Sequence, residues 1–164
     1  MLSTAKILVP RSFSDSYTIY YNPRNYLSLR FYRLHPKLDE VALIAYLNTT
    51  LVALIIETLG NRSLGLGVLD FFMADFLSLR IPVILNNDLK SAFSILKSTY
   101  VCTVKEEYGF NIINGQPDFY PRQERKQLDD VVFDALRLTK GERDAIYEAI
   151  INLVEARINK AGSI

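Results

Sequence analysis

The 164-residue sequence has few of the side chains that metal sites and nucleophilic catalysis require. Its single cysteine excludes an internal disulfide, and with only one histidine beside it there are too few soft ligands for a structural zinc site. A serine–histidine–acid triad would need His35, which stands before Pro36 in an expected loop and is interpreted as a surface or structural residue. Cys102 lies in a strand-like run and is interpreted as a small buried hydrophobic residue. This composition suits a reducing compartment, so we expect a cytoplasmic protein.

The sequence also lacks a hydrophobic run long enough to cross a bilayer. Its most apolar stretch, 41–56, has polar residues at 48–50 and falls short of the roughly 20 residues that a transmembrane helix needs. The N-terminal segment has only a short apolar run, broken by Pro10 and Arg11, which is not typical of a signal peptide. We therefore expect a helix buried on most sides and no membrane partner.

No intact catalytic motif is present. The segment 64–67 (LGLG) resembles part of a nucleotide-binding glycine turn, but Asp70 stands where the third glycine would be and the segment follows an expected helix. The segment 22–26 (NPRNY) departs from the Asn/Asp-Pro-Pro-aromatic loop of amino-methyltransferases and is interpreted as a turn. The acidic pair 129–130 is interpreted as stabilising the start of a helix. We expect no enzymatic activity from this chain alone.

The formal charge of +1 hides an uneven distribution. Up to Lys37 there are six basic residues and one acidic residue, Asp15, which leaves a local excess of five positive charges. Seven aromatic residues are interleaved with these cations. Cations that hold phosphates and planar side chains that contact bases and sugars are the components of a DNA-binding surface.

Hydrophobic patterns and turn residues predict an α+β fold: a small antiparallel sheet in the N-terminal half packs on a long buried helix, and a C-terminal helical hairpin follows. Strands are expected at 6–9, 17–21 and 30–34, and helices at 39–59, 87–98, 123–136 and 142–160. Asp39 is the expected cap of the long helix, and Thr139 has capping-box spacing to Glu142. The predicted organisation is an α+β region at 1–98, a linker or ordered loop at 99–121, and a helical pair at 122–164.

Several segments carry a family resemblance through their order and spacing. They are 6–11 (KILVPR), 20–23 (YYNP), 31–32 (FY), 43–51 (LIAYLNTTL), 57–69 (ETLGNRSLGLGVL), 128–136 (LDDVVFDAL) and 139–157. In this order the chain, apart from 99–121, resembles the C-terminal target-recognition region of adenine-specific (N6) DNA methyltransferases of restriction–modification systems, including the fused restriction–methylation enzymes. The family pattern usually has asparagine or threonine before the Phe-Tyr pair, where this sequence has Leu29 and Arg30.

The resemblance implies a DNA-binding specificity module without its catalytic domain. The domain that binds S-adenosylmethionine and carries the Asn-Pro-Pro-Tyr-type loop would precede this segment, so no cofactor is expected on this chain. The implied partners are double-stranded DNA, which must be held while the target base is flipped, and a methyltransferase catalytic domain or subunit. The amphipathic closing helices can also bury a stripe against a second copy, which makes a homodimer through them a candidate assembly.

Basic and aromatic residues of the N-terminal third, with one arginine after the long helix, are the candidate contacts to DNA. They are Arg11, Tyr20, Tyr21, Arg24, Arg30, Tyr32, Arg33, Lys37 and Arg62. Alternation along 30–34 places Arg30, Tyr32 and Leu34 on one face of a strand and the residues between them on the other, and one of the two sets must be core.

Two alternatives stay open from the sequence. These basic and aromatic residues can be ordinary solvated surface, and Arg62 can instead stabilise the C-terminal end of the helix before it. The whole chain can also be a helical interaction or assembly module that does not bind DNA, an alternative favoured by its small net charge and amphipathic closing helices.

Overall fold

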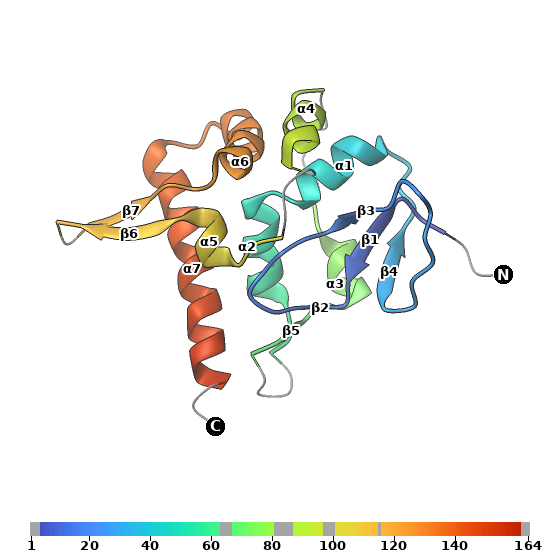
Figure 1. Ribbon diagram of the computed structural model, residues 1–164, viewed down its shortest axis with the longest axis horizontal. Helices are drawn as coiled ribbons and strands as arrows, with labels where there is room; N and C mark the ends of the chain where they lie inside the picture. Colours follow the sequence, from blue (N-terminus) through green and yellow to red (C-terminus); the bar gives the residue numbers. More distant parts are fainter. Residues whose placement is uncertain (1–3, 63–66, 81–86, 97–100, 115, 162–164) are drawn as a thin grey trace.

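The fold belongs to the α+β class, as the sequence predicts. The computed structural model describes residues 4–62, 67–80, 87–96, 101–114 and 116–161. Within these ranges the chain forms seven helices and three small antiparallel sheets, and its last element is a long helix (Figure 1). The N-terminal sheet and the C-terminal helices lie toward opposite sides of the molecule, with the second helix between them.

The N-terminal sheet is built around strand β1 (Ile7–Pro10). This strand pairs antiparallel with β3 (Tyr20–Tyr21) on one side and with β4 (Phe31–Leu34) on the other. A separate pairing joins β2 (Ser12–Phe13), just after β1, to β5 (Leu69–Asp70). The predicted strands at 6–9 and 30–34 are therefore confirmed within one residue, whereas only the last two residues of the strand predicted at 17–21 pair.

The long helix expected at 39–59 is two helices, α1 (Glu40–Leu47) and α2 (Thr50–Leu59), which meet at an angle of 63°. Asn48 ends α1 and turns its side chain to the segment before β3. Its Oδ1 accepts a hydrogen bond from the Ile19 N–H at 3.0 Å, and its Nδ2 donates to the Ile19 carbonyl at 2.9 Å. Thr49 is then extended, with φ −75° and ψ 155°, which no continuous helix allows.

Asp129, in helix α6 (Gln123–Ala135), fixes the start of α2 from a distant part of the chain. Its carboxylate accepts hydrogen bonds from the Thr50 N–H at 2.7 Å and from the Thr50 hydroxyl at 2.5 Å. The expectation that the acidic pair 129–130 stabilises the start of its own helix is wrong, because α6 begins six residues earlier. Asp129 instead accepts hydrogen bonds at the N-terminal end of a different helix, α2.

The predicted capping residues of the first and last helices are confirmed. The Asp39 carboxylate accepts from the N–H groups of Val41 and Ala42 at the start of α1, both at 3.0 Å. At the start of α7 (Lys140–Ala161), Thr139 and Glu142 form the expected capping box, with the Thr139 N–H donating to Glu142 at 2.8 Å. The remaining helices are α3 (Met73–Ser78), α4 (Asn87–Leu96) and α5 (Val104–Tyr108).

The segment predicted at 99–121 as a linker or ordered loop forms α5 and a β-hairpin in its described part. The hairpin consists of β6 (Phe110–Ile113) and β7 (Gln116–Phe119), paired antiparallel. Val104 and Tyr108 of α5 are buried, and α5 packs on α7. Helix α5 is therefore part of the folded core.

One hydrophobic cluster contains side chains from all three predicted segments, from Ile7 in β1 to Val154 in α7. Helix α4 packs on α1 and α6, and α7 packs on α2. No single helix in the described ranges has both the length and the apolar character needed to cross a membrane.

Candidate nucleic-acid interface

Eight of the nine residues predicted to contact DNA lie on the β1–β3–β4 sheet or in the segments next to it. Arg11 follows β1, Tyr20 and Tyr21 form β3, and Tyr32 and Arg33 belong to β4. Arg24 and Arg30 lie in the connection from β3 to β4, and Lys37 follows β4. The ninth, Arg62, lies elsewhere, just after α2.

The register of the sheet decides which face each strand residue occupies, because cross-strand partners share a face. Leu8 lies between Tyr20 and Arg33, and Pro10 lies beside Phe31. These residues therefore share the outer face of the sheet. The rings of Tyr20 and Phe31 meet edge to face with centroids 5.5 Å apart, and Tyr20 is 40% exposed. The outer face presents aromatic surface beside a cation.

The opposite face of the sheet packs on the hydrophobic core. Ile7 lies between Tyr21 and Leu34, and Val9 lies beside Tyr32, and all three of these partners pack against the core. The alternation along 30–34 is thereby resolved: Tyr32 and Leu34 face inward, and Phe31 and Arg33 face outward.

The two inward-facing tyrosines of the candidate set therefore have structural contacts. The Tyr21 ring meets Phe93 of α4 edge to face, with centroids 6.4 Å apart. Tyr32 is half-buried, and the guanidinium of Arg11 lies over its ring at 5.2 Å from the centroid. Tyr32 thus positions a candidate cation.

Asn22 organises the loop between β3 and β4. Its buried side chain donates to the carbonyls of Ala5 at 2.8 Å and Tyr26 at 3.0 Å, and it accepts from the Tyr26 N–H at 2.9 Å. Asn25 takes a left-handed conformation with φ 55°, as a tight turn requires. The segment 22–26, interpreted as a turn from the sequence, is therefore a turn that the hydrogen bonds of Asn22 hold in place.

This loop exposes residues that the sequence prediction missed. Tyr26 is 64% exposed and accepts a hydrogen bond from Arg24 at 3.3 Å. Lys6 donates from its Nζ to the Pro23 carbonyl at 2.9 Å, which places another cation beside the loop. The available signal was the mixture of basic and aromatic residues in 20–32, which includes Tyr26.

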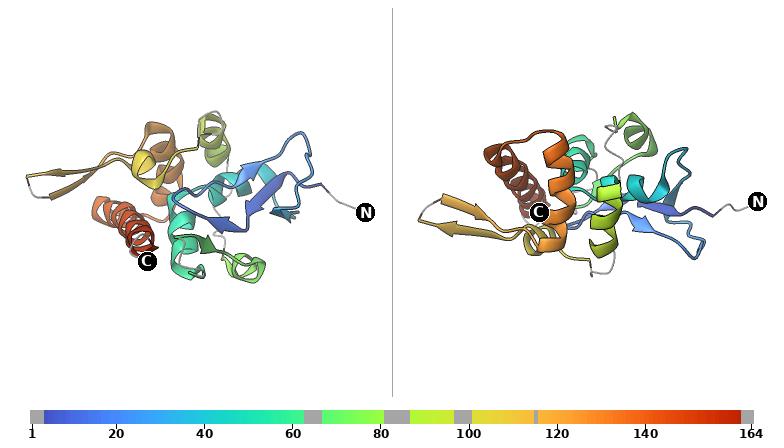
Figure 2. Two further views of the ribbon diagram at one scale, coloured as in Figure 1. Left: turned by 60° about the horizontal axis from the view of Figure 1, so that its bottom comes forward. Right: turned by 90° about the horizontal axis from the view of Figure 1, so that it is seen from above.

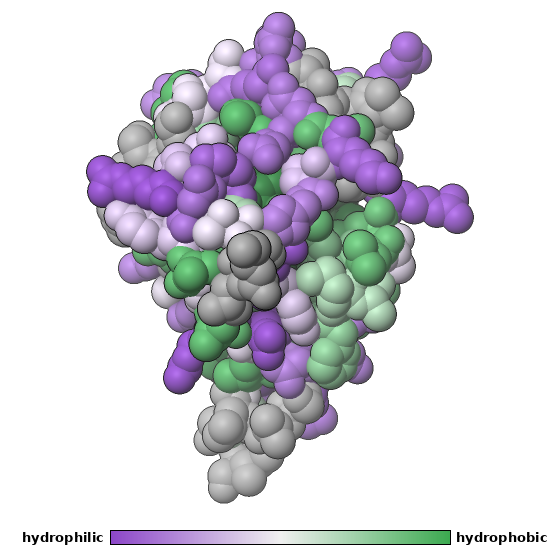
Figure 3. Space-filling model, turned by 90° about the vertical axis from the view of Figure 1, so that its right-hand side faces the viewer, coloured by the Kyte–Doolittle hydropathy of each residue, from purple (hydrophilic) through white to green (hydrophobic). Residues whose placement is uncertain are grey.

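We define the basic end of the molecule as the six cations on or beside this sheet. They are Lys6, Arg11, Arg24, Arg30, Arg33 and Lys37. From residue 38 onward the chain has thirteen basic and seventeen acidic residues, so the rest of the molecule is net acidic. Figure 3 faces the end that carries the sheet and shows hydrophilic side chains over much of it, with hydrophobic side chains grouped to one side.

Arg62 belongs to a different environment. Its guanidinium lies 4.0 Å from the carboxylate of Glu57, a fully buried residue of α2. Glu57 also accepts from Arg157 of α7 at 3.0 Å and from the Tyr17 hydroxyl. Burial raises the pKa of Tyr17, and its hydrogen bond to Glu57 raises it further. Arg62 is thus placed beside a buried structural network.

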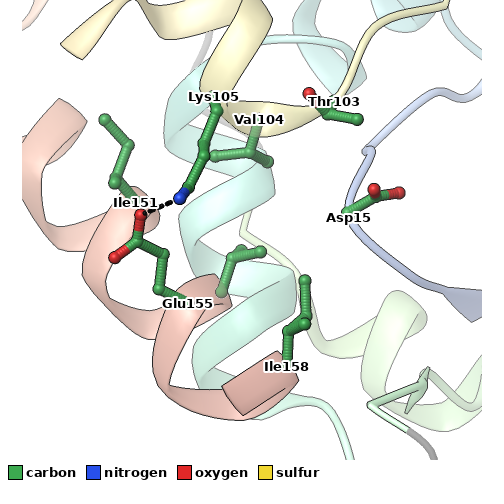
Figure 4. Close-up of a pocket in the computed structure, with 8 residues that line it drawn as sticks. Asp15, Thr103, Val104, Lys105, Ile151, Glu155 and Ile158 are labelled. Carbon is green, nitrogen blue, oxygen red and sulfur yellow. Dashed lines mark ion pairs between the residues drawn. The ribbon is translucent and has the colours of Figure 1, made fainter. Parts of the chain in front are cut away.

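A small cavity between α5, α7 and the segment after β2 is the other candidate site (Figure 4). Its walls are mainly apolar and include Val104, Ile151 and Ile158. Its main polar feature is the ion pair between Lys105 and Glu155 at 2.8 Å, in which both charges already have a partner. A binding site of this kind would need polar groups that converge on a ligand, so the cavity is the weaker candidate.

Catalytic and metal-binding groupings do not emerge from the described residues. They contain no group of three or more His, Cys, Asp or Glu side chains that could hold a metal ion. His35 is exposed, and Cys102 is buried, as the sequence predicts for a small hydrophobic residue. Every buried side-chain nitrogen and oxygen in the described ranges has a hydrogen-bond partner. Comparisons with protein-family models, curated proteins and solved structures find no match to this chain.

Proposed function

We propose that the chain binds double-stranded DNA through its basic end. The observation that carries this proposal is the separation of charge: six cations surround one small sheet, and the rest of the chain is net acidic. Such an asymmetry attracts a polyanion to one end of a protein and orients it there.

Different residues of the sheet and its loop are suited to different parts of a DNA duplex. The exposed cations Arg24, Arg30 and Lys37 are suited to phosphates, because their positions at loop ends let them follow the backbone. Arg33, on the outer face beside Tyr20 and Phe31, is suited to a base edge in the major groove, which is wide enough for a β-ribbon. Tyr26 at the loop surface adds a planar ring that can contact a sugar or base.

Within this proposal, the family resemblance suggests a narrower role. The chain would be the target-recognition portion of an adenine-specific DNA methyltransferase, and a separate catalytic domain or subunit would bind S-adenosylmethionine and transfer the methyl group. The basic end would hold the duplex while the target adenine leaves the stack. This narrower role rests on the segments quoted above, and it predicts a preference for particular base sequences.

The alternative role, a protein-interaction or assembly module without DNA binding, is favoured by exposed apolar side chains at the same end. Leu27 and Leu29 in the loop are 55% and 74% exposed, and Leu77 of α3 is 72% exposed. Apolar side chains gathered on a surface are typical of contacts with another protein. The experiment below separates the two roles.

The test is fluorescence anisotropy with a mixed-sequence DNA duplex at several salt concentrations. We compare the wild type with Arg30→Ala/Arg33→Ala and with Lys140→Ala/Lys160→Ala, which removes two exposed cations from α7. We expect the wild-type affinity to fall steeply with salt, with a log–log slope of about −0.9 for each phosphate neutralised. Loss of both arginines should weaken binding about tenfold and make the slope less steep by about 1, because Arg30 is the phosphate contact of the two.

The α7 variant should bind as the wild type does, because both lysines belong to α7, which lies away from the sheet (Figure 1). Equal losses in the two double variants, or no binding at low salt, would overturn the proposal. Enrichment of one adenine-containing motif from a random duplex library would support the target-recognition role, and binding without enrichment would oppose it.

A further inference from the structure

The β6–β7 hairpin extends from the body of the molecule as an arm (Figures 1 and 2). The hairpin packs against α7 through β7, and its two strands pair with each other. Two-stranded ribbons are marginally stable on their own in water. Phe110 and Ile113 of β6 are 42% and 50% exposed, so the arm also leaves apolar side chains in solvent.

The register of the hairpin shows which backbone groups point away from it. The Tyr120 N–H donates to the Gly109 carbonyl at 3.1 Å, which makes these two residues a hydrogen-bonded pair. Antiparallel ladders alternate between hydrogen-bonded and non-hydrogen-bonded pairs. Phe110–Phe119 and Ile112–Pro117 are therefore the non-hydrogen-bonded pairs, so the N–H and C=O groups of Phe110 and Ile112 point outward from the β6 edge.

The two edges of the arm differ in their capacity to take another strand. Along β7, position 117 is a proline without an N–H, and the charged Asp118 lies beside it. Proline and charge are the devices by which natural proteins block edge pairing. The sequence of β6, Phe-Asn-Ile-Ile, has neither device. In the described part of the chain β6 pairs only with β7, so its outer edge has no strand beside it.

We propose that the outer edge of β6 pairs with the β6 edge of a second copy of this chain. In an antiparallel arrangement with a twofold axis at Asn111, Phe110 of each copy lies opposite Ile112 of the other. Both residues have outward-pointing N–H and C=O groups, so the two pairs form four backbone hydrogen bonds. The product is a four-stranded sheet in the order β7–β6–β6–β7.

A second copy is the occupant that this edge fits. Two outward-pointing residues separated by one inward-pointing residue are complementary to the same segment in the opposite direction, which is the condition for a twofold interface. The strand carries no charge, so two copies do not repel each other. The pairing also removes the open β6 edge of each copy, because the four-stranded sheet ends on both sides in a β7 strand with its proline. The inference is independent of DNA binding.

The first test measures the mass of the full chain by sedimentation velocity across a wide concentration range. We expect the wild type to change from monomer to dimer as concentration rises. Ile112→Pro removes an outward-pointing N–H from β6, as proline does at position 117 in β7, and should leave a monomer. Ile113→Lys places a cation at an exposed position of each β6 and should also favour the monomer. Leu59→Lys introduces the same charge at a comparably exposed position of α2 and should dimerise as the wild type does.

The second test measures the register through a cysteine cross-link. In the proposed pairing the two Asn111 residues are a non-hydrogen-bonded pair, whose Cα atoms lie about 4.5 Å apart, within the range of a disulfide. Asn111→Cys should form an intermolecular disulfide on oxidation, and Asp118→Cys on β7 should form much less. A wild type that stays monomeric at all concentrations, dimers that persist in both β6 variants, or equal cross-linking at positions 111 and 118 would overturn the proposal.

Discussion

Arg157 of α7 is almost completely buried, and its guanidinium is surrounded by acceptors from three distant segments. It donates to the Glu57 carboxylate at 3.0 and 3.2 Å, to the Ser14 carbonyl at 2.5 Å and to the Gly67 carbonyl. A buried charge is stable only when such partners replace its water. This one side chain therefore joins the last helix to α2 and to the chain around the sheet.

Asp129 makes the stability of the fold depend on pH. Burial raises its pKa from 3.8 to about 6, although the charge of Arg125 and hydrogen bonds from Thr50 favour the carboxylate. Between these two values the folded chain keeps a proton that the unfolded chain has released. The contribution of Asp129 to the free energy of unfolding is therefore complete below about pH 4, and it is lost as the pH rises through about 6. The loss is at most about 3 kcal/mol.

The matching experiment is urea unfolding of the wild type and Asp129→Asn from about pH 4 to pH 7. The wild type should be the more stable at low pH, and the difference between the two proteins should narrow as pH rises. Asp39, Glu106 and Glu142, whose pKa values are lowered, act in the opposite direction but in both proteins. A difference that stays constant or widens with pH would show that Asp129 is not protonated first in the folded state.

At the scale of the elements, helix ends were predictable where their signals are local. Asp39 and Thr139 cap helices with groups two or three residues away, and both were identified from spacing. The break between α1 and α2 was not, because a run of apolar residues on both sides predicts one helix. Its causes are the contacts of Asn48 with Ile19 and of Thr50 with Asp129, which come from distant segments.

The candidate site was also predictable only in part, where its signal lies in the local sequence. The cluster of cations before residue 38 is a property of the sequence, and the structure places it around one sheet. The inward orientation of Tyr32 depends on which face of β4 meets the core, and strand alternation alone leaves both options open. The β6–β7 hairpin was missed although Asn-Gly between two short runs is a hairpin signal, because Pro117 and Gly109 suggested a loop.

The turn between α6 and α7 contains a position at which a substitution should raise the stability of the fold. Arg137 follows α6 with φ 57°, and the Leu138 N–H after it donates to the Phe133 carbonyl at 2.9 Å, which is a helix-ending motif that favours glycine. Arg137→Gly should therefore raise the free energy of unfolding by about 0.5–1 kcal/mol, after the greater flexibility of glycine in the unfolded chain is allowed for.

Urea unfolding at neutral pH measures this effect. Arg137→Ala is the matched control, because it removes the same charge but keeps a Cβ in the left-handed conformation, so it should not stabilise the protein. Equal stability of the glycine and alanine variants would contradict the backbone explanation and assign any change to the charge.

At the scale of the whole molecule, the distribution of charge divides the chain into two parts, whereas the hydrophobic core joins them. The charge separates residues before 38 from the rest, whereas the hydrophobic cluster joins strands, central helices and closing helices. Leu128, Val132 and Phe133 of α6 and Ile150 of α7 are completely buried in this cluster. The proposed DNA-binding end therefore depends for its stability on helices at the opposite end.

This dependence predicts that a chain ending at residue 121 does not fold, even though it retains the whole basic end. The truncation exposes the surfaces of α2 and α4 that α7 and α6 cover, and it leaves Glu57 without Arg157 and the Thr50 N–H without Asp129. Uncompensated buried charge alone destabilises a fold by about 3–5 kcal/mol, a large part of the stability of a domain. Thermal unfolding followed by circular dichroism should show a cooperative transition for a chain ending at residue 161 and none for the chain ending at 121. A cooperative transition in the shorter chain would mean that the N-terminal region is an independent domain, and that the polar contacts of α6 and α7 only attach the helices to it.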